Sequence, residues 1–164
     1  MTTMIEIRAL VSTYKGESVH LVGLLDVPTN VVMITKTAEF STTPKSTKDT
    51  VIVTDTPSLV SCWQLAYNEE QHLSEVISVY QERYKLGLIV FDEALSRFKP
   101  SQVIQPGQVD ERGIKWRFDS NITNNHMASM LLIWASSRAA RGHNVAYEAK
   151  EQVSDDDSAL PFWI

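Results

Sequence analysis

The residues best suited to chemistry in this 164-residue chain form a short alternating run of bases and aromatic rings. Positive charge and aromatic surface alternate in Lys115-Trp116-Arg117-Phe118. Cationic side chains neutralise phosphates, and aromatic rings offer platforms on which nucleic-acid bases stack. The run therefore indicates binding of single-stranded nucleic acid. We expect three further bases from loops to lie beside it: Lys45, Lys48 and Arg112.

The same run is also typical of an ordinary half-buried strand. Alternate side chains of a strand point to opposite faces, so Trp116 and Phe118 share one face while Lys115 and Arg117 share the other. In that interpretation the rings belong to the core and the bases only meet water. The sequence leaves both interpretations open.

Groups arranged for catalysis or metal binding are few. Zinc sites need clustered ligands, and the sequence scatters its four histidines, which are His20, His72, His126 and His143. The single cysteine, Cys62, lies beside Trp63 and is expected to be packed and inert. The sequence has no phosphate-loop, nucleophile-elbow or dinucleotide-binding pattern. We expect no enzymatic activity, no metal and no cofactor.

A small Mg²⁺-dependent nuclease is one alternative class. Magnesium prefers oxygen ligands, which carboxylates supply. The carboxylates available for such a site are Asp92, Glu93, Asp110, Glu111 and Asp119. No regular spacing connects them.

The last residues of the sequence are acidic and then apolar. The pattern is carried by Asp155, Asp156, Asp157, Leu160, Pro161 and Phe162. It resembles the C-terminal tail of bacterial and phage single-stranded DNA-binding proteins, in which replication and repair partners dock an acidic run and a terminal Pro-Phe. The resemblance is confined to this tail, and here Trp163 and Ile164 follow the phenylalanine. It implies single-stranded DNA and replication or repair proteins as partners.

Other interpretations of the tail remain open. Its apolar residues could instead pack back on the domain as a closing segment. A non-catalytic phage adaptor or inhibitor, or a virion assembly protein, could use such a tail to occupy partners of the host's own DNA-binding protein.

Composition predicts one domain followed by a tail. We assign residues 1–152 to a single globular domain and 153–164 to the acidic tail, because most of the net charge of −5 lies from Glu148 onward. One cysteine and a start without a signal pattern predict the cytoplasm of a bacterium or a phage-infected cell. No stretch is long and apolar enough to predict membrane association. The sequence leaves the oligomeric state open, a homo-oligomer included.

Hydrophobic periodicity predicts an α+β fold. The first third of the chain predicts four strands, expected to be antiparallel, at Ile5–Ala9, Val19–Gly23, Val31–Ile34 and Val51–Val53. Helical spacing follows in three segments, Pro57–Tyr67, Leu73–Tyr84 and Leu88–Phe98. Pro106-Gly107 predicts a turn, and Ile114–Phe118 a further strand. A last helix is expected from Thr123 to about Arg141, ending at Gly142. Its inward residues would be Met127, Met130, Leu131 and Trp134.

The tail resemblance adds one expectation about the fold. Proteins with such tails usually present a five-stranded barrel of the oligonucleotide-binding (OB) type to DNA. The four N-terminal strands and Ile114–Phe118 supply five strands for such a barrel, although a long helical stretch separates them.

We predict that truncation after Gln152 leaves the domain folded and abolishes recruitment of replication or repair partners. Asp155, Asp156 and Asp157 repel one another and prefer water, so little stability is lost with them. DNA affinity should stay the same or rise, because a competing polyanion is removed. Thermal melting and DNA titration of the truncated chain measure both effects. A large fall in melting temperature would show instead that the tail closes the domain.

Overall fold

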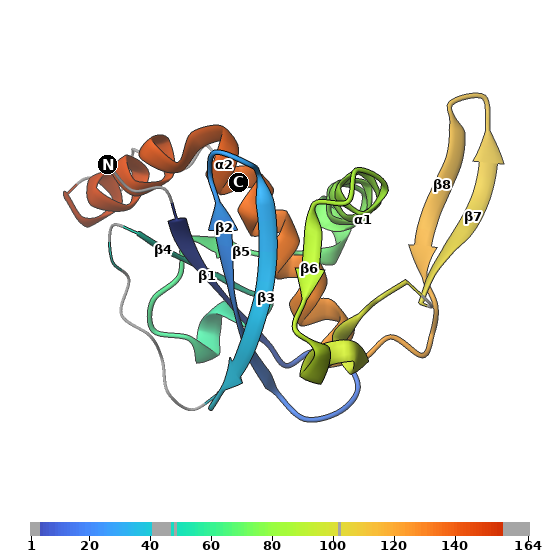
Figure 1. Cartoon of the computed structure of the whole chain (residues 1–164), viewed down its shortest axis with the longest axis horizontal. Coiled ribbons are helices and arrows are strands. Elements are labelled where there is room, and N and C mark those ends of the chain that lie inside the picture. The colour runs from blue at the N-terminus through green and yellow to red at the C-terminus, as the bar shows by residue number, and fades with distance from the viewer. Residues whose placement is uncertain (1–3, 41–46, 48, 102, 156–164) are drawn as a thin grey trace.

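A six-stranded mixed sheet forms the centre of the protein (Figure 1). The computed structural model describes residues 4–40, 47, 49–101 and 103–155. The strand order across the sheet is β5-β4-β1-β2-β3-β6. The strands are β1 (Met4–Val11), β2 (Val19–Asp26), β3 (Val31–Ala38), β4 (Thr50–Thr54), β5 (Leu65–Ala66) and β6 (Ile89–Phe91).

The directions of these strands confirm part of the prediction and correct part of it. The first three strands form the expected antiparallel meander, in which Ile7 pairs with Gly23 and Gly23 with Ile34. The outer strands are parallel to their neighbours, β4 to β1, β5 to β4 and β6 to β3. Only β2 therefore runs against the other strands of this sheet. The sheet is open, and Ile114–Phe118 belongs to a separate two-stranded sheet, so the expected OB-like barrel is not formed.

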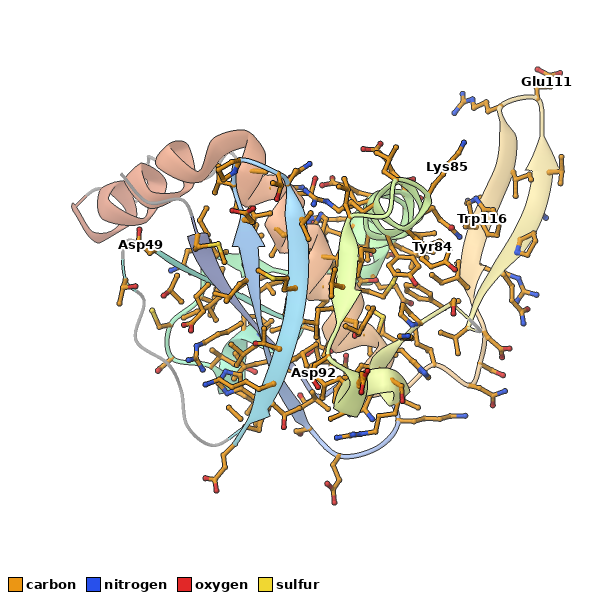
Figure 2. The ribbon with its side chains drawn as sticks, in the orientation of Figure 1. Asp49, Tyr84, Lys85, Asp92, Glu111 and Trp116 are labelled. Carbon is orange, nitrogen blue, oxygen red and sulfur yellow. The ribbon has the colours of Figure 1, made fainter. Side chains whose placement is uncertain are left out.

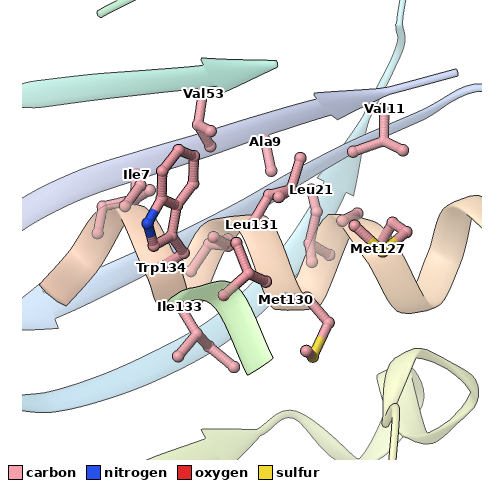
Figure 3. Packing of buried hydrophobic residues seen from close by; sticks show 14 of the residues in the cluster. Ile7, Ala9, Val11, Leu21, Val53, Met127, Met130, Leu131, Ile133 and Trp134 are labelled. Atoms are coloured by element: carbon pink, nitrogen blue, oxygen red, sulfur yellow. The ribbon is translucent and has the colours of Figure 1, made fainter. Parts of the chain in front are cut away.

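One face of the sheet is covered by α2 (Asn124–Asp155), whose first half is rich in apolar residues. Every residue from Met127 to Ser136 is buried, including the four predicted to point inward. Figure 3 shows Met127, Leu131 and Trp134 packed beside alternate residues of β1 and beside Leu21 of β2 and Val53 of β4. A Cβ atom at Gly23 would lie 2.9 Å from Leu132 Cδ2, so the glycine lets the helix approach the sheet closely.

The other side of α2 is covered by α1 (Glu69–Lys85), which confirms the predicted helix around Leu73–Tyr84. The Nε1 atom of Trp134 donates a 2.8 Å hydrogen bond to Glu75, and Arg138 donates two further bonds to the same carboxylate. Near its end, α1 is tied to the β2–β3 turn, because the guanidinium of Arg83 donates to the backbone and side-chain oxygens of Asn30.

Two predicted helices are wrong. Residues 57–67 form a short 3₁₀ turn, η1 (Pro57–Leu59), and the edge strand β5. Residues 88–98 form the edge strand β6 and a second 3₁₀ segment, η2 (Glu93–Phe98). The apolar residues of these segments recur at helical spacing, but only some of them pack at the edges of the sheet, where Val60 and Phe98 are buried while Leu59 is 64% exposed. Cys62 lies between η1 and β5. It is half-buried and packs against the cluster of Leu10, Ile52 and Val60, which is separate from the main core.

The last helix begins as predicted and ends later. Thr123 is its N-cap, since its hydroxyl accepts the backbone N–H of His126. The helix continues through Gly142 to Asp155, so the predicted stop at Gly142 is wrong. Residues 153–155, which we assigned to the tail, are its last residues, and Asp156, Asp157, Leu160, Pro161 and Phe162 lie outside the described residues. Among the helices described, none combines the length and apolar composition needed to cross a membrane.

The contacts of Glu75 predict a measurable loss of stability. Replacing Glu75 with Ala leaves the fully buried Trp134 without its acceptor and removes the ion pair with Arg138. We expect the free energy of unfolding to fall by about 1–3 kcal/mol, measured by urea unfolding. The control is Glu82→Ala on the exposed side of the same helix, which should stay within about 0.5 kcal/mol of the parent. Equal losses for both variants would contradict this role.

Three histidines predict that acid destabilises the fold. Burial lowers the pKa of His20, His72 and His126 below the ordinary value of 6.5. As the pH falls through 6.5, the unfolded chain therefore binds more protons at these histidines than the folded chain does. The stability that is present at neutral pH is lost as the pH falls. We expect the melting temperature to drop between about pH 7.5 and pH 5.5, and to drop less in His72→Gln. A constant or rising melting temperature would contradict the prediction.

Candidate nucleic-acid interface

A two-stranded hairpin carries most of the residues expected to bind nucleic acid. It consists of β7 (Ile104–Asp110) and β8 (Gly113–Phe118), which pair antiparallel. Figure 1 shows the hairpin standing away from the main sheet, beside α1. The strand predicted at Ile114–Phe118 is confirmed, and it belongs to this projecting ribbon.

The hairpin contains a bulge where the sequence predicted a turn. Pro106 pairs with Trp116 inside β7, and the register then shifts before Val109. A Cβ atom at Gly107 would lie 2.9 Å from the carbonyl oxygen of Lys115, so only glycine lets the two strands approach this closely. Pro106-Gly107 therefore bends the ribbon, and the chain reverses at residues 111–112.

The base of the hairpin is fixed to the body. Val103 and Ile104 are buried in the core, and the backbone N–H of Asp119 donates to the carbonyl oxygen of Val103. Gln105 Nε2 donates a 2.8 Å hydrogen bond to the Asp119 carboxylate. The ribbon therefore leaves the body in a defined direction.

Both interpretations of the alternating run describe part of the observed geometry. Trp116 and Phe118 are half-buried and pack against the core, whereas Lys115 and Arg117 are exposed. Nearer the tip, Ile114 is 55% exposed on the aromatic side of β8. The core therefore holds one part of the Trp116 side chain and leaves another part accessible.

A groove of about 350 Å³ lies between α1 and β8. Its lining residues on α1 are Ser74, Ile77 and Ser78, and those on the hairpin are Arg112, Gly113, Ile114, Lys115 and Trp116. In Figure 2, Trp116 points from β8 toward α1, near whose end Tyr84 and Lys85 project. Tyr84 is 61% exposed, and its ring stacks on that of Tyr80 with centroids 5.8 Å apart. Trp116, Arg112 and two serine hydroxyls thus line one groove, and the side chain of Lys115, which alternates with that of Trp116 along β8, lies on the other face of the strand.

The structure brings together three of the seven predicted nucleic-acid contacts. Arg112, Lys115 and Trp116 line the groove, while Arg117 and Phe118 lie on the same hairpin outside its lining. Lys45 and Lys48 fall outside the described residues.

Sequence reasoning missed the contribution of α1. Ser74 and Ser78 lie one turn apart, so both face the groove. Serine has a lower helix propensity than the long polar residues. Two serines four residues apart in a predicted helix were therefore the available signal for a functional face of α1.

The carboxylates of the nuclease alternative lie in different places. Asp92 caps η2 by accepting the N–H of Ala94, and Asp119 accepts the N–H of Asn121 at the base of the hairpin. Figure 2 shows Glu111 at the hairpin tip, far from Asp92. Among the residues described, no three His, Cys, Asp or Glu side chains form a group that could hold a metal ion.

Comparison of the chain with protein-family models, curated proteins and solved structures finds no significant match.

Proposed function

We propose that this protein binds single-stranded DNA in the groove between α1 and β8. The observation that carries the proposal is the meeting of Trp116, Lys115 and Arg112 around one open groove. A base stacks on the accessible part of Trp116, Arg112 contacts a flanking phosphate at the groove, and Lys115 contacts a phosphate that passes over the other face of β8. Ser74 and Ser78 supply hydroxyls on the opposite wall for hydrogen bonds to sugar or base.

The position of Trp116 favours a single strand over a duplex. Its ring lies inside the groove with part of its surface packed on the core. A base reaches such a ring only when it is unstacked and unpaired, which costs a duplex free energy and a single strand little. The exposed Lys115 and Arg117 make phosphate contacts whose strength does not depend on sequence.

Recruitment of replication or repair proteins through the acidic tail is the second part of the proposal. Its support is the sequence pattern alone, which ends in Leu160, Pro161 and Phe162. When DNA is absent, an acidic tail also occupies the cations of the groove, and DNA must then displace it in order to bind. We propose that the protein acts in the cytoplasm of a bacterium or of a phage-infected cell. Its single cysteine fits this compartment, because disulfides are rare in the reducing cytoplasm.

Replacing Trp116 with Ala is expected to weaken binding of a fluorescent single-stranded oligonucleotide by about 1–3 kcal/mol, because one base loses its stacking partner. Fluorescence anisotropy at two salt concentrations measures the affinity. The matched control is Trp63→Ala, which removes a 42% exposed tryptophan that does not line the groove and should leave the affinity unchanged.

Two further measurements separate binding from folding. Trp116→Phe keeps an aromatic platform and should retain most of the affinity, and thermal melting of each variant reports any loss of structure. Equal affinity of Trp116→Ala and the parent protein, or tighter binding of duplex than of single strands, would overturn the proposed function.

A further inference from the structure

A second cleft, of about 450 Å³, opens at the end of the main sheet where the β1–β2 loop, the end of β3, η2 and the start of α2 meet. Its polar lining includes Lys15, Ser18, Thr37, Arg97, Thr123 and Asn125. None of its lining residues lines the groove between α1 and β8. Its size is that of ordinary small-ligand pockets. The residues come from four separate parts of the chain, so only the fold brings them together.

The charges of this cleft favour an anion. Lys15 and Arg97 are exposed cations from different elements of the fold, and Glu17 is the one carboxylate among the described residues that line the cleft. The remaining polar lining consists largely of hydroxyls and an amide, which can donate hydrogen bonds to oxyanions. Two cations from different elements can contact one phosphate group from two sides.

Arg97 is held in place before any ligand arrives. Its Nη1 atom donates a 3.0 Å hydrogen bond to the carbonyl oxygen of Ala94, and its guanidinium lies 4.8 Å from the ring centroid of the buried Phe98. A guanidinium has five N–H donors, and one bond to Ala94 leaves several to face a ligand. Less side-chain entropy is lost when such a preset group binds an anion.

The wall that carries Lys15 is also fixed, through the buried Asn124. The side-chain oxygen of Asn124 accepts the N–H of Tyr14, and its Nδ2 donates to the carbonyl oxygens of Gly16 and Glu17. The backbone N–H of Asn124 donates to the carbonyl oxygen of Lys15. These four bonds fasten the β1–β2 loop to the start of α2, so the cleft does not depend on a ligand to form.

His20 lies at the inner wall as a neutral group and is no metal ligand. Arg8 Nη1 lies 3.2 Å from His20 Nε2, and because a guanidinium only donates, this nitrogen accepts. His20 Nδ1 then carries the proton and donates to the carbonyl oxygen of Glu39, 3.1 Å away. Both ring nitrogens are therefore occupied, and the positive charge of the cleft comes from Lys15 and Arg97.

We propose that this cleft binds the phosphate group of a small phosphate monoester of mononucleotide size. Lys15 and Arg97 neutralise the phosphate, while Ser18, Thr37 and Asn125 donate hydrogen bonds to the phosphate or to the group that it carries. The proposal is independent of DNA binding, since the two sites share no lining residue.

The test is titration of the ¹⁵N-labelled full chain with adenosine 5′-monophosphate, inorganic phosphate and adenosine, followed by amide chemical shifts. The phosphate-bearing probes should shift amides of Lys15, Gly16 and Arg97 in a saturable way, and adenosine should not. Arg97→Gln and Lys15→Gln should each weaken binding about tenfold, whereas Lys85→Gln, which removes one exposed charge from the end of α1, should leave it unchanged. If one of these two variants fails to fold, the other still tests the proposal.

Three results would overturn the proposal. The first is the absence of shifts at the cleft up to about 10 mM of each phosphate probe. The second is a set of shifts confined to the β7–β8 hairpin, which would assign the anion to the other groove. The third is equal weakening by Lys85→Gln and Arg97→Gln, which would show that only the total charge of the protein matters.

Discussion

The fold depends on one helical segment that is buried on all sides. From Met127 to Ser136, α2 packs on the sheet with one face and on α1 and η2 with the other. A helix in this position must pair every polar side chain inside the protein. Ser129 donates to the carbonyl oxygen of Phe98, and Trp134 donates to Glu75. These two bonds connect α2 to η2 and to α1, and α1 in turn forms one wall of the groove beside β8.

The sequence predicted the elements whose signal is local. Strict alternation identified β1, β2 and β8, and helical periodicity identified α1 and the start of α2. The sequence patterns did not predict pairing between strands that are distant in the chain. The segments around Val60 and Phe91 have helical spacing, but they lie at the two edges of the sheet, where pairing with β4 and β3 overrides local preference. Gly142 is a good helix stop by composition, yet α2 runs through it, so that signal alone was insufficient.

The two candidate sites differ in how much of them the sequence contains. Lys115 and Trp116 are neighbours on one strand, so the basic and aromatic character of the hairpin was visible at once. That Ser74 and Ser78 stand across from them follows only from packing. In the second cleft, Lys15 and Arg97 are far apart in sequence and line the same cleft, whose wall at Lys15 is fixed by the bonds of Asn124 to the β1–β2 loop. No motif records such a meeting, since each residue alone is an ordinary surface cation.

The place of α2 in the chain has a consequence for biosynthesis. Every strand of the main sheet precedes it in sequence, yet its residues fill the space against which those strands pack (Figure 3). While the ribosome is still making the hairpin, the sheet has one apolar face without its cover, a state that invites aggregation. The β1–β2–β3 meander pairs strands that are neighbours in sequence, whereas the core is complete only after α2 has emerged. Packing of the core therefore waits for the buried segment of α2, and a nascent chain that ends before Met127 carries a sheet with one apolar face open to aggregation.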